Sequence, residues 1–532
     1  MNVEATTPAE APADRTARIA RSALLLATLA FAGLVLTLGW QLAIAATYGT
    51  SAALDAFWIG AAIPTGVANV FHLGVLTLLF VVVFHMPQRD RAEKDRLASS
   101  VFNAVGIGTV GVGALLALGA PWLVAWMGPG IAPEHRGLAT ATLRWLTLSL
   151  LVSAPLGAMA GILNAFERFG PFAWSRVLGL AAQIALLFAL ARPLGVDALT
   201  LALIAGPLLM VAACVPAFRK TGFRWSPTIA FRGDEARAVL RMLVALVLLG
   251  LLSRGNQIVD RWFASRLGEG AVSALEYGWR FEIPVSQILA FSVALPSFAM
   301  MALQAGEQRL DEFRETVGAS VRLTALLVAP VIVFLVVMRE PLAVLWFQRG
   351  AFSPEAAATV ASLIPFLGVM FVCLGLGPVM VFGMLMLERK ALLIGILTAE
   401  LLLNAAFCVP LSAAMGVRGI SCATTSAMVI SNLALWTFFV RHMGGFSRAA
   451  IASRALRTAL ACAGAAGVLA LAHAALWNRF GIEGAVPILL GCAALGIPFL
   501  ALYAGLCHAA GLVVIHFEGV RPRVRVTGEA RA

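Results

Sequence analysis

Long apolar runs separated by short polar segments make up the chain from about residue 20 onward. An apolar run of ~20 residues is long enough to cross the hydrocarbon core of a bilayer as a helix. The pattern predicts fourteen such spans, near 20–46, 54–86, 99–127, 138–165, 171–191, 197–218, 238–264, 271–303, 316–338, 356–387, 391–415, 418–440, 451–477 and 484–515. We therefore expect an all-α polytopic membrane protein with about 14 transmembrane helices.

The composition excludes a soluble protein. The chain is 61% hydrophobic and 12% charged, whereas soluble domains carry roughly 25% charged residues. Its net charge of +12 does not indicate nucleic-acid binding, because the cations lie in short loops between apolar runs. With the N-terminus inside, 27 of the 39 Lys and Arg fall on the cytoplasmic side, seven on the opposite side and five within spans. This bias predicts that both termini are cytoplasmic.

The sequence contains no motif for metal binding or catalysis. The seven Cys and seven His are dispersed, without CxxC, HxxxH or HExxH spacing, so we expect no metal, disulfide or cofactor. Membrane enzymes that act on lipid-linked sugars normally keep their catalytic residues in a large loop. The longest loop predicted here, 219–237, is cytoplasmic and carries Trp, Pro and Arg. We therefore do not expect an enzyme.

Two pairs of similar segments indicate an internal duplication. Segments 41–64 and 257–284 each run from a span end through a turn to Pro, and segments 195–210 and 416–430 each open a span with Gly-Val. Many secondary transporters are built from such repeats. The predicted organisation is a disordered cytoplasmic tail (1–18), an N-lobe of spans 1–6 (19–218), a cytoplasmic inter-lobe loop (219–237), a C-lobe of spans 7–12 (238–440), spans 13 and 14 (441–515) and a cytoplasmic tail (516–532).

Charge is concentrated between residues 254 and 296, inside two of the predicted spans. The stretch carries Arg254, Asn256, Gln257, Asp260, Arg261, Glu276, Arg280 and Glu282. A charged side chain near the bilayer centre costs ~2.5–3.5 kcal/mol on the insertion scale, so such residues normally face a bundle interior or a wet cavity. We expect two membrane helices joined by a tight hairpin, with these side chains in the functional cavity.

Several motifs in the chain resemble those of the MurJ/MviN family. They are Asp55-Ala56-Phe57 with Ile63-Pro64, Val259-Asp260 with Phe263-Ala264-Ser265, Leu295-Pro296-Ser297 and, the most specific, Phe347-Gln348-Arg349-Gly350-Ala351-Phe352. The collinear resemblance covers most of residues 20–440. It implies a fold of the multidrug, oligosaccharidyl-lipid and polysaccharide exporter superfamily, with two six-helix lobes around a central cavity and two C-terminal helices. Family members flip the undecaprenyl-diphosphate-linked precursor lipid II across the bacterial inner membrane, where this multi-pass chain is also expected.

The chain departs from the family pattern in its first lobe. The family has an Arg-Asp pair late in span 1, two arginines after the proline of span 2, and a Glu and a Gln soon afterwards. Those positions read Trp40, Gln41, Ala68, Asn69, Leu73 and Leu78. In span 8 the family's Asp-Arg reads Trp279-Arg280, so only the arginine is kept. Most of the first-lobe cations that the family uses for a diphosphate are therefore missing.

Arg280 and Arg254 are the remaining candidates for contacting a diphosphate. Such a group needs delocalised cationic donors in a low-dielectric cavity, and Arg presents a forked set of them. Glu282, Asn256 and Gln257 are expected beside them as further substrate-binding residues. The alternative for Arg254 is a static salt bridge to Asp260 or Glu282.

A second group of candidates has coupling or structural roles: Asp260, Arg261, Asp55, Glu276 and Glu400. Carboxylates inside spans often act as proton or ion relays, so Asp260 is a candidate coupling carboxylate for H+ or Na+. The alternative is that Asp260 pairs with Arg261 or Arg266 and fixes the hairpin. Glu276 and Glu400 have the same two interpretations. Asp55 starts the second span, where an acid favours the positive end of the helix.

Together these features predict a MurJ-like flippase. It would move a polyprenyl-diphosphate-linked saccharide from the cytoplasmic to the periplasmic leaflet by alternating access, driven by H+, Na+ or the membrane potential. Membrane lipids and cell-envelope synthesis enzymes are the other expected partners. The alternatives are an exopolysaccharide repeat-unit exporter, a cation-coupled antiporter of the same superfamily, or a non-transporting membrane scaffold for cell-envelope synthesis.

Overall fold

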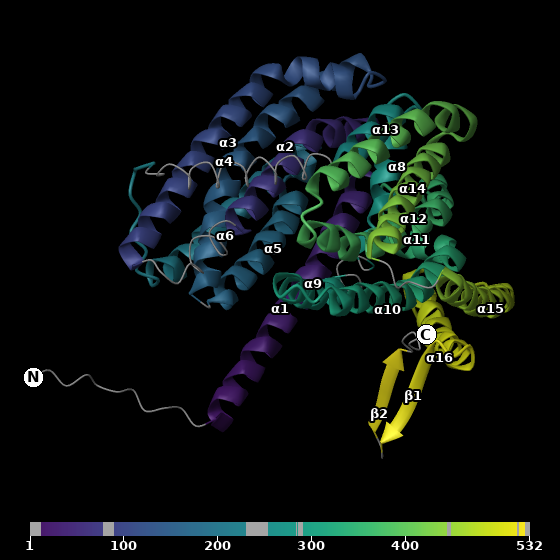
Figure 1. Cartoon of the computed structure of the whole chain (residues 1–532). Helices are drawn as coiled ribbons and strands as arrows, with labels where there is room; N and C mark the ends of the chain where they lie inside the picture. The colour runs from purple at the N-terminus through teal and green to yellow at the C-terminus, as the bar shows by residue number, and fades with distance from the viewer. Residues whose placement is uncertain are drawn as a thin grey trace, which may run out of the picture. The chain divides into compact units, whose positions relative to one another are not determined.

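The computed structural model describes residues 12–77, 90–166, 168–229, 254–283, 285, 291–443, 448–518 and 521–526. The described chain is almost entirely helical and forms two compact units (Figure 1). The first unit comprises Met1–Thr47, Ala56–Met127 and Ala132–Leu251. The second comprises Tyr48–Asp55, Gly128–Ile131 and Leu252–Ala532.

Six helices supply the first unit. They are α1 (Pro12–Tyr48), α2 (Ala52–Thr77), α3 (Arg91–Met127), α4 (Pro133–Ala165), α5 (Phe169–Leu194) and α6 (Asp197–Arg219). Helix α3 packs on α4, and α6 packs on both α4 and α5. In the α3–α4 contact, Leu97 and Val101 lie against Ala154 and Ala158. The small alanine side chains let the two backbones approach closely, as is common between membrane helices.

The second unit contains most of the remaining helices. Residues 254–264 are helical, and after them come α8 (Ala271–Trp279), α9 (Phe291–Gly306), α10 (Leu310–Val337), α11 (Arg339–Phe347), α12 (Pro354–Met386), α13 (Lys390–Met415), α14 (Val417–Met443), α15 (Arg448–Phe480) and α16 (Ala485–Ala509). Helix α12 packs on α10 and α14, and α13 packs on α14. The start of α12 is fixed by Ser353, whose hydroxyl accepts a hydrogen bond from the Ala356 amide at 3.2 Å, with Pro354 as the first helical residue.

Aromatic side chains fix the short helix α8 within the second unit. Tyr277 and Phe281 are fully buried. The Phe281 ring stacks on Trp346 with centroids 4.4 Å apart, and the Tyr277 ring lies 5.0 Å from Phe347. Large aromatic pairs of this kind add ~0.5–1.5 kcal/mol beyond their area burial. They keep the charged residues on either side of α8 in a defined position.

Two helix junctions, one in each unit, have the same backbone geometry. Gly195 ends α5 with φ 55° and ψ −134°, and Gly416 ends α13 with φ 60° and ψ −134°. Each glycine is followed by Val and by the next helix, α6 or α14. A β-carbon is disfavoured at such positive φ, which accounts for glycine at both places. The shared junction agrees with the duplication that the sequence indicates.

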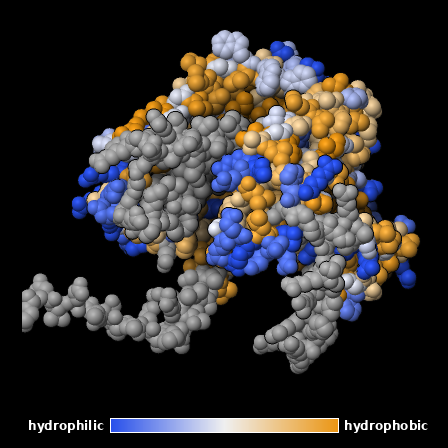
Figure 2. Space-filling model, in the orientation of Figure 1, coloured by the Kyte–Doolittle hydropathy of each residue, from blue (hydrophilic) through white to orange (hydrophobic). Residues whose placement is uncertain are grey.

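Twelve helices among the described residues are long and apolar enough to cross a membrane. The all-helical membrane fold is therefore confirmed, while the seventh predicted span, 238–264, lies partly outside the described residues. Many apolar side chains on these helices face outward, including Trp122, Leu471 and Ile497, which are 76%, 75% and 74% exposed. Figure 2 shows hydrophobic residues over much of the visible surface, as expected of helices that contact lipid.

Three boundaries differ from the sequence prediction. Helix α1 begins at Pro12, so residues 12–18, expected in a disordered tail, are helical. The predicted eighth span, 271–303, is interrupted near its start, because α8 ends at Trp279 and residues 280–281 form a turn. Strands β1 (Val513–Glu518) and β2 (Arg521–Val526) form an antiparallel hairpin, where the end of a span and a tail were expected. The alternating sequence of β2, RPRVRV, has the period of two that is typical of strands.

Candidate functional site

The charged stretch forms a helix, a turn and a second helix within the second unit. Residues 254–264 are helical, residues 265–270 form the turn, and α8 follows. Gly270 precedes α8 in the left-handed conformation, with φ 79°. The predicted hairpin is therefore present, although its second helix, α8, ends at Trp279.

Glu276 connects the two helices by binding two arginines. Its Oε1 accepts a hydrogen bond from Nε of Arg261 at 2.7 Å and lies 2.6 Å from Nη2 of the same side chain. Its Oε2 lies 3.1 Å from Nη2 of Arg280, one helical turn further on. The side chains of Glu276 and Arg261 are only 10% and 11% exposed, whereas that of Arg280 is 26% exposed. Arg261 is therefore enclosed in the ion pair, and Arg280 remains accessible at its edge.

Arg254 lies at the exposed end of the same polar strip. Its Nη1 donates a hydrogen bond to Oε1 of Gln257 at 3.1 Å, and its side chain is exposed. Glu282 is half-buried just beyond α8. Arg254 is therefore exposed, while Arg280 and Glu282 are partly exposed.

A separate buried network surrounds Asp260. Its Oδ1 accepts hydrogen bonds from Nδ2 of Asn404 on α13 at 3.0 Å and from Oγ1 of Thr424 on α14 at 2.7 Å. The side chain is 1% exposed, and Oδ2 has no hydrogen-bond partner among the described residues. A buried carboxylate oxygen without a partner carries a large desolvation cost. This atom is therefore a candidate position for a proton or a bound cation.

The same network includes two more of the predicted residues. Asn256 donates through Nδ2 to Oε1 of Glu400 on α13 at 2.7 Å, and its own Oδ1 accepts from Asn404 at 3.3 Å. Asn256 and Glu400 are 7% and 8% exposed. In this conformation the Asn256 amide is therefore engaged in helix–helix contacts, while its neighbour Gln257 belongs to the outer strip with Arg254.

The proposed pairing of Asp260 with Arg261 or Arg266 is not found. Arg261 binds Glu276, and the guanidinium of Arg266 lies over the Trp262 ring, 3.7 Å from its centroid. The sequence reasoning also missed Thr424 as a partner of Asp260. The only signal was a run of polar residues, Thr424, Thr425 and Ser426, inside an apolar span.

Asp55 binds the start of α8 instead of its own helix. Its carboxylate accepts hydrogen bonds from the backbone amides of Gly270 and Ser273, each at 2.7 Å, and from the Ser273 hydroxyl. Nearby, the Tyr277 hydroxyl donates to the Gly49 carbonyl at 3.0 Å. As predicted from the sequence, Asp55 lies in the first turn of the second span, α2; its carboxylate hydrogen-bonds the N-terminus of a different helix, α8, where an acid is favourable.

Within the described part of the chain, no group of three or more His, Cys, Asp or Glu is placed to hold a metal ion. The chemistry available at the site is therefore of two kinds. The arginines of the outer strip can bind an anion, and the buried carboxylate network can bind a proton or a small cation.

Known proteins resemble this chain in sequence and in fold. A family model described as "Lipid II flippase MurJ" matches residues 44–491. The "Probable lipid II flippase MurJ" of Rhizobium meliloti (strain 1021) is 29% identical over 343 residues, which are 61% of this chain and 62% of the relative. The matched part thus spans about three fifths of that relative's length.

Solved structures share the fold. "Lipid II flippase MurJ, inward closed conformation" matches with a TM-score of 0.75 at 19% identity, covering 91% of this chain and 99% of that one. An inward-facing multidrug resistance MATE family transporter of the MOP superfamily matches with a TM-score of 0.60 at 15% identity, covering 77% and 94%. These likenesses show the fold, and the family match shows membership. The chain belongs to the lipid II flippase MurJ family, whose members are multi-pass transporters of the bacterial cytoplasmic membrane and not enzymes.

Proposed function

We propose that this protein is a flippase that moves a polyprenyl-diphosphate-linked saccharide, lipid II or a related envelope precursor, from the cytoplasmic to the periplasmic leaflet by alternating access. The observation that carries the proposal is the pair of accessible arginines, Arg254 and Arg280, in a stretch flanked by apolar spans. The family match supports the class of cargo. The charge bias of the loops supports a topology with both termini in the cytoplasm.

Arg254 and Arg280 are proposed to bind the anionic headgroup. A guanidinium keeps its charge in a low-dielectric cavity and can donate two parallel hydrogen bonds to a phosphate. Arg280 is oriented by Glu276 at 3.1 Å while its side chain stays 26% exposed. Gln257 orients Arg254 in the same way, at 3.1 Å. Arg261 is assigned a structural role, because its guanidinium is enclosed with Glu276.

Asp260 is proposed as the coupling carboxylate. It is nearly inaccessible, and one of its oxygens has no hydrogen-bond partner among the described residues. Binding of H+ or Na+ there would remove the cost of an unpaired buried charge. The side chains that bind Asp260, Asn404 and Thr424, come from α13 and α14. Binding of an ion to the carboxylate would therefore change the hydrogen bonds to both helices. Such a change could shift the equilibrium between the inward-open and outward-open conformations, which is the coupling that transport requires.

Complementation tests the proposal. The chain is expressed in bacteria depleted of their own lipid II flippase, and survival is scored after the protein has been detected in the membrane. We expect rescue by the wild type and loss of rescue in Arg280→Ala. Arg266→Ala is the matched control, because Arg266 is an exposed cation of the same hairpin that stacks on Trp262. Full rescue by Arg280→Ala would remove Arg280 from the cargo site.

A second candidate function is export of exopolysaccharide repeat units, or cation-coupled antiport, within the same superfamily. The observation that favours it is the replacement of the first-lobe cations, since Trp40 and Gln41 are buried uncharged residues. Failure of the wild type to rescue, with the protein present in the membrane, would favour this candidate. If no lipid-linked saccharide or organic cation moved in proteoliposomes, a scaffold for envelope synthesis would remain.

A further inference from the structure

One arginine inside a span of the first unit has no acidic partner among the described residues. Arg176 lies on α5, which begins at Phe169, so the residue is about two turns, or ~10 Å, inside the candidate span. Its guanidinium forms no hydrogen bond or ion pair with any residue that the structure describes. A charged side chain in a span normally faces a bundle interior or a wet cavity. The direction in which Arg176 points is therefore informative about its role.

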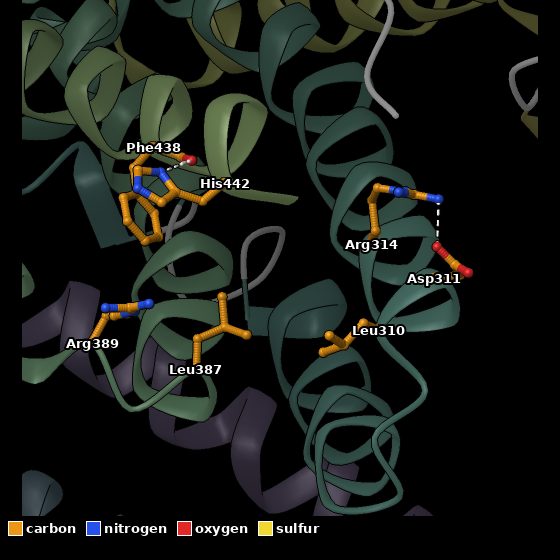
Figure 3. Close-up of a pocket in the computed structure, with 7 residues that line it drawn as sticks. All are labelled: Leu310, Asp311, Arg314, Leu387, Arg389, Phe438 and His442. Atoms are coloured by element: carbon orange, nitrogen blue, oxygen red, sulfur yellow. Dashed lines mark hydrogen bonds and ion pairs between the residues drawn. The ribbon is translucent and has the colours of Figure 1, made fainter. Parts of the chain in front are cut away.

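Several arginines of the second unit, by contrast, have an acid beside them. Figure 3 shows Arg314, on the first turns of α10, directed toward Asp311, with Nη2 2.8 Å from Oδ1. Arg261 and Arg280 share Glu276. The positive charge of these arginines is at least partly compensated within the protein, whereas that of Arg176 is available to another partner.

The lipid-facing side of α5 lies opposite Arg176. Trp174, Ala181, Ala185 and Phe188 are exposed along one side of the helix. With about 100° of rotation per residue, Arg176 lies about 120–180° around the helix from each of them. Arg176 is nevertheless exposed itself. Its guanidinium therefore opens into space on the inner side of α5, and extension along the lipid-facing surface to the headgroups does not account for its exposure.

The inner side of α5 meets α1 and α2, which belong largely to the same unit. His72 of α2 stacks on Phe172, one turn before Arg176, with ring centroids 6.1 Å apart. The same histidine lies within electrostatic reach of Arg176. A β-carbon added at Gly39 of α1 would lie 3.6 Å from Cδ1 of Ile184, two turns after Arg176. Arg176 is thus on the side of α5 that faces the first two helices.

The charge of Arg176 replaces charge that α2 does not carry. The positions at which the family resemblance places two arginines, Ala68 and Asn69, lie one turn before His72 on α2. We infer that Arg176 is a subsite of the first unit for the diphosphate of the cargo, supplying from α5 the positive charge that Ala68 and Asn69 do not supply. Its forked guanidinium suits a phosphate group. The inference rests on the proposed function, because the ligand is the diphosphate of the proposed cargo.

Farnesyl diphosphate is the probe for this subsite, because it carries a diphosphate on a short polyprenyl chain and has no saccharide. Microscale thermophoresis measures its affinity for the purified full chain in detergent. We expect Arg176→Ala to weaken binding about tenfold, the effect of losing one charged hydrogen-bond donor. Arg176→Lys keeps a positive charge and should recover most of the affinity. Arg192→Ala, which removes an exposed arginine from the last turn of the same helix, should bind as the wild type does.

Equal affinities of the wild type and Arg176→Ala would overturn the inference. A lysine variant as weak as the alanine variant would also overturn it, because the side chain would then act through packing and not through charge. Arg280→Ala separates the inference from the proposed function. Weaker binding in Arg280→Ala alone would retain the proposed headgroup residue and remove Arg176, and weaker binding in Arg176→Ala alone would do the reverse. Absence of binding to the wild type would contradict both.

If Arg176→Ala does not fold, a cysteine one turn away tests the subsite with Arg176 in place. In a chain without its native cysteines, Leu180→Cys lies on the same side of α5 and should react with an anionic methanethiosulfonate reagent, since thiolates form in water. Farnesyl diphosphate should protect it. Ala185→Cys, on the lipid-facing side, should react slowly with or without the probe. Reaction of Leu180→Cys that the probe does not slow would contradict the inference.

Discussion

Glu276 is the residue that compensates the charge of two arginines in an apolar surrounding. Its two oxygens bind Arg261 and Arg280 on either side of the hairpin. In a low-dielectric interior, removing one member of such a set leaves the other charges uncompensated, and this costs more than the set itself contributes. The negative charge of Glu276 compensates the enclosed Arg261. The more exposed Arg280 at the edge of the ion pair can therefore offer its positive charge to a ligand.

Replacing Glu276 with Gln should destabilise the protein strongly. The amide is neutral, so two arginines would face each other without a counter-charge, and we expect a loss of about 3 kcal/mol in the free energy of unfolding. Thermal unfolding in detergent measures the effect. Glu307→Gln is the control, because Glu307 pairs with Arg309 at the surface, where both side chains are about half exposed, and such pairs contribute ~0–1 kcal/mol. Equal melting temperatures for the two variants would contradict this account of the ion pair.

Asp260→Asn separates charge from packing at the buried carboxylate. The amide oxygen can still accept from Asn404 and Thr424, so we expect the variant to fold and to reach the membrane in normal amount. Transport should lose its dependence on a Na+ or proton gradient, because no ionisable oxygen remains to bind either ion. Uptake into proteoliposomes with and without each gradient measures this. An Asp260→Asn protein that kept the full gradient dependence would show that the coupling site lies elsewhere.

At the residue scale, the sequence located the charged positions but not their partners. Charge inside an apolar stretch is visible directly in the sequence, and this signal selected Arg254, Arg280 and Glu282 as candidates. The partners of Asp260 are more than 140 residues away along the chain. Asn and Thr are common inside membrane helices, so nothing in the local pattern distinguishes Asn404 and Thr424 from other polar residues. The choice of partner depends on helix packing, which a single sequence does not display.

Among the elements, the short helix α8 is poorly able to form by itself. It has nine residues, and isolated helices shorter than ~12 residues are marginal even in favourable sequences. Its N-terminus is bound by Asp55, and its side is packed against the aromatic rings of α11. The helix therefore depends on contacts from a segment more than 200 residues earlier as much as on its own sequence.

Asp55→Ala should weaken α8 specifically. It removes three hydrogen bonds to the first turn of the helix, and loss of a cap typically costs about 1–2 kcal/mol. Asp197→Ala is the matched control, because Asp197 is an exposed acid in the first turn of α6, where it contributes only ~0.3–1 kcal/mol through the helix dipole. Hydrogen exchange of the α8 amides measures the difference. Unchanged protection of α8 in Asp55→Ala would mean that the aromatic contacts alone maintain the helix.

Long apolar helices were predictable at the element scale, and interrupted ones were not. The bounds expected for α12, α13 and α14 lie within a few residues of those observed, because each begins and ends at a clear change from polar to apolar residues. The interruption of the eighth span at the end of α8 was missed. The charged residues around Trp279 were assigned to the interior of one long span, because the sequence returns to an apolar run after them, so the end of α8 was not recognised. The C-terminal hairpin was missed because its alternating pattern was interpreted as a charged tail.

At the scale of the whole molecule, the unequal distribution of Lys and Arg between the loops predicts which loops face the cytoplasm. A cysteine at exposed Arg224, in the loop after α6, should react with a membrane-impermeant maleimide only after the cells are permeabilised. A cysteine at exposed Arg349, before α12, should react in intact cells. The seven native cysteines are first replaced to remove background labelling. Labelling of both positions in intact cells, or the reverse order, would refute the predicted orientation.

The junctions at Gly195 and Gly416 also constrain how this chain can evolve. Any missense change in a glycine codon adds at least a β-carbon, and both positions have a backbone conformation that side chains rarely adopt. Neither codon therefore has a neutral neighbour among the single-nucleotide changes that replace the amino acid. Since one such position lies in each unit, the two should be depleted together in a randomly mutagenised population selected for function. A requirement of local backbone geometry would then preserve the record of duplication after the surrounding sequences have diverged.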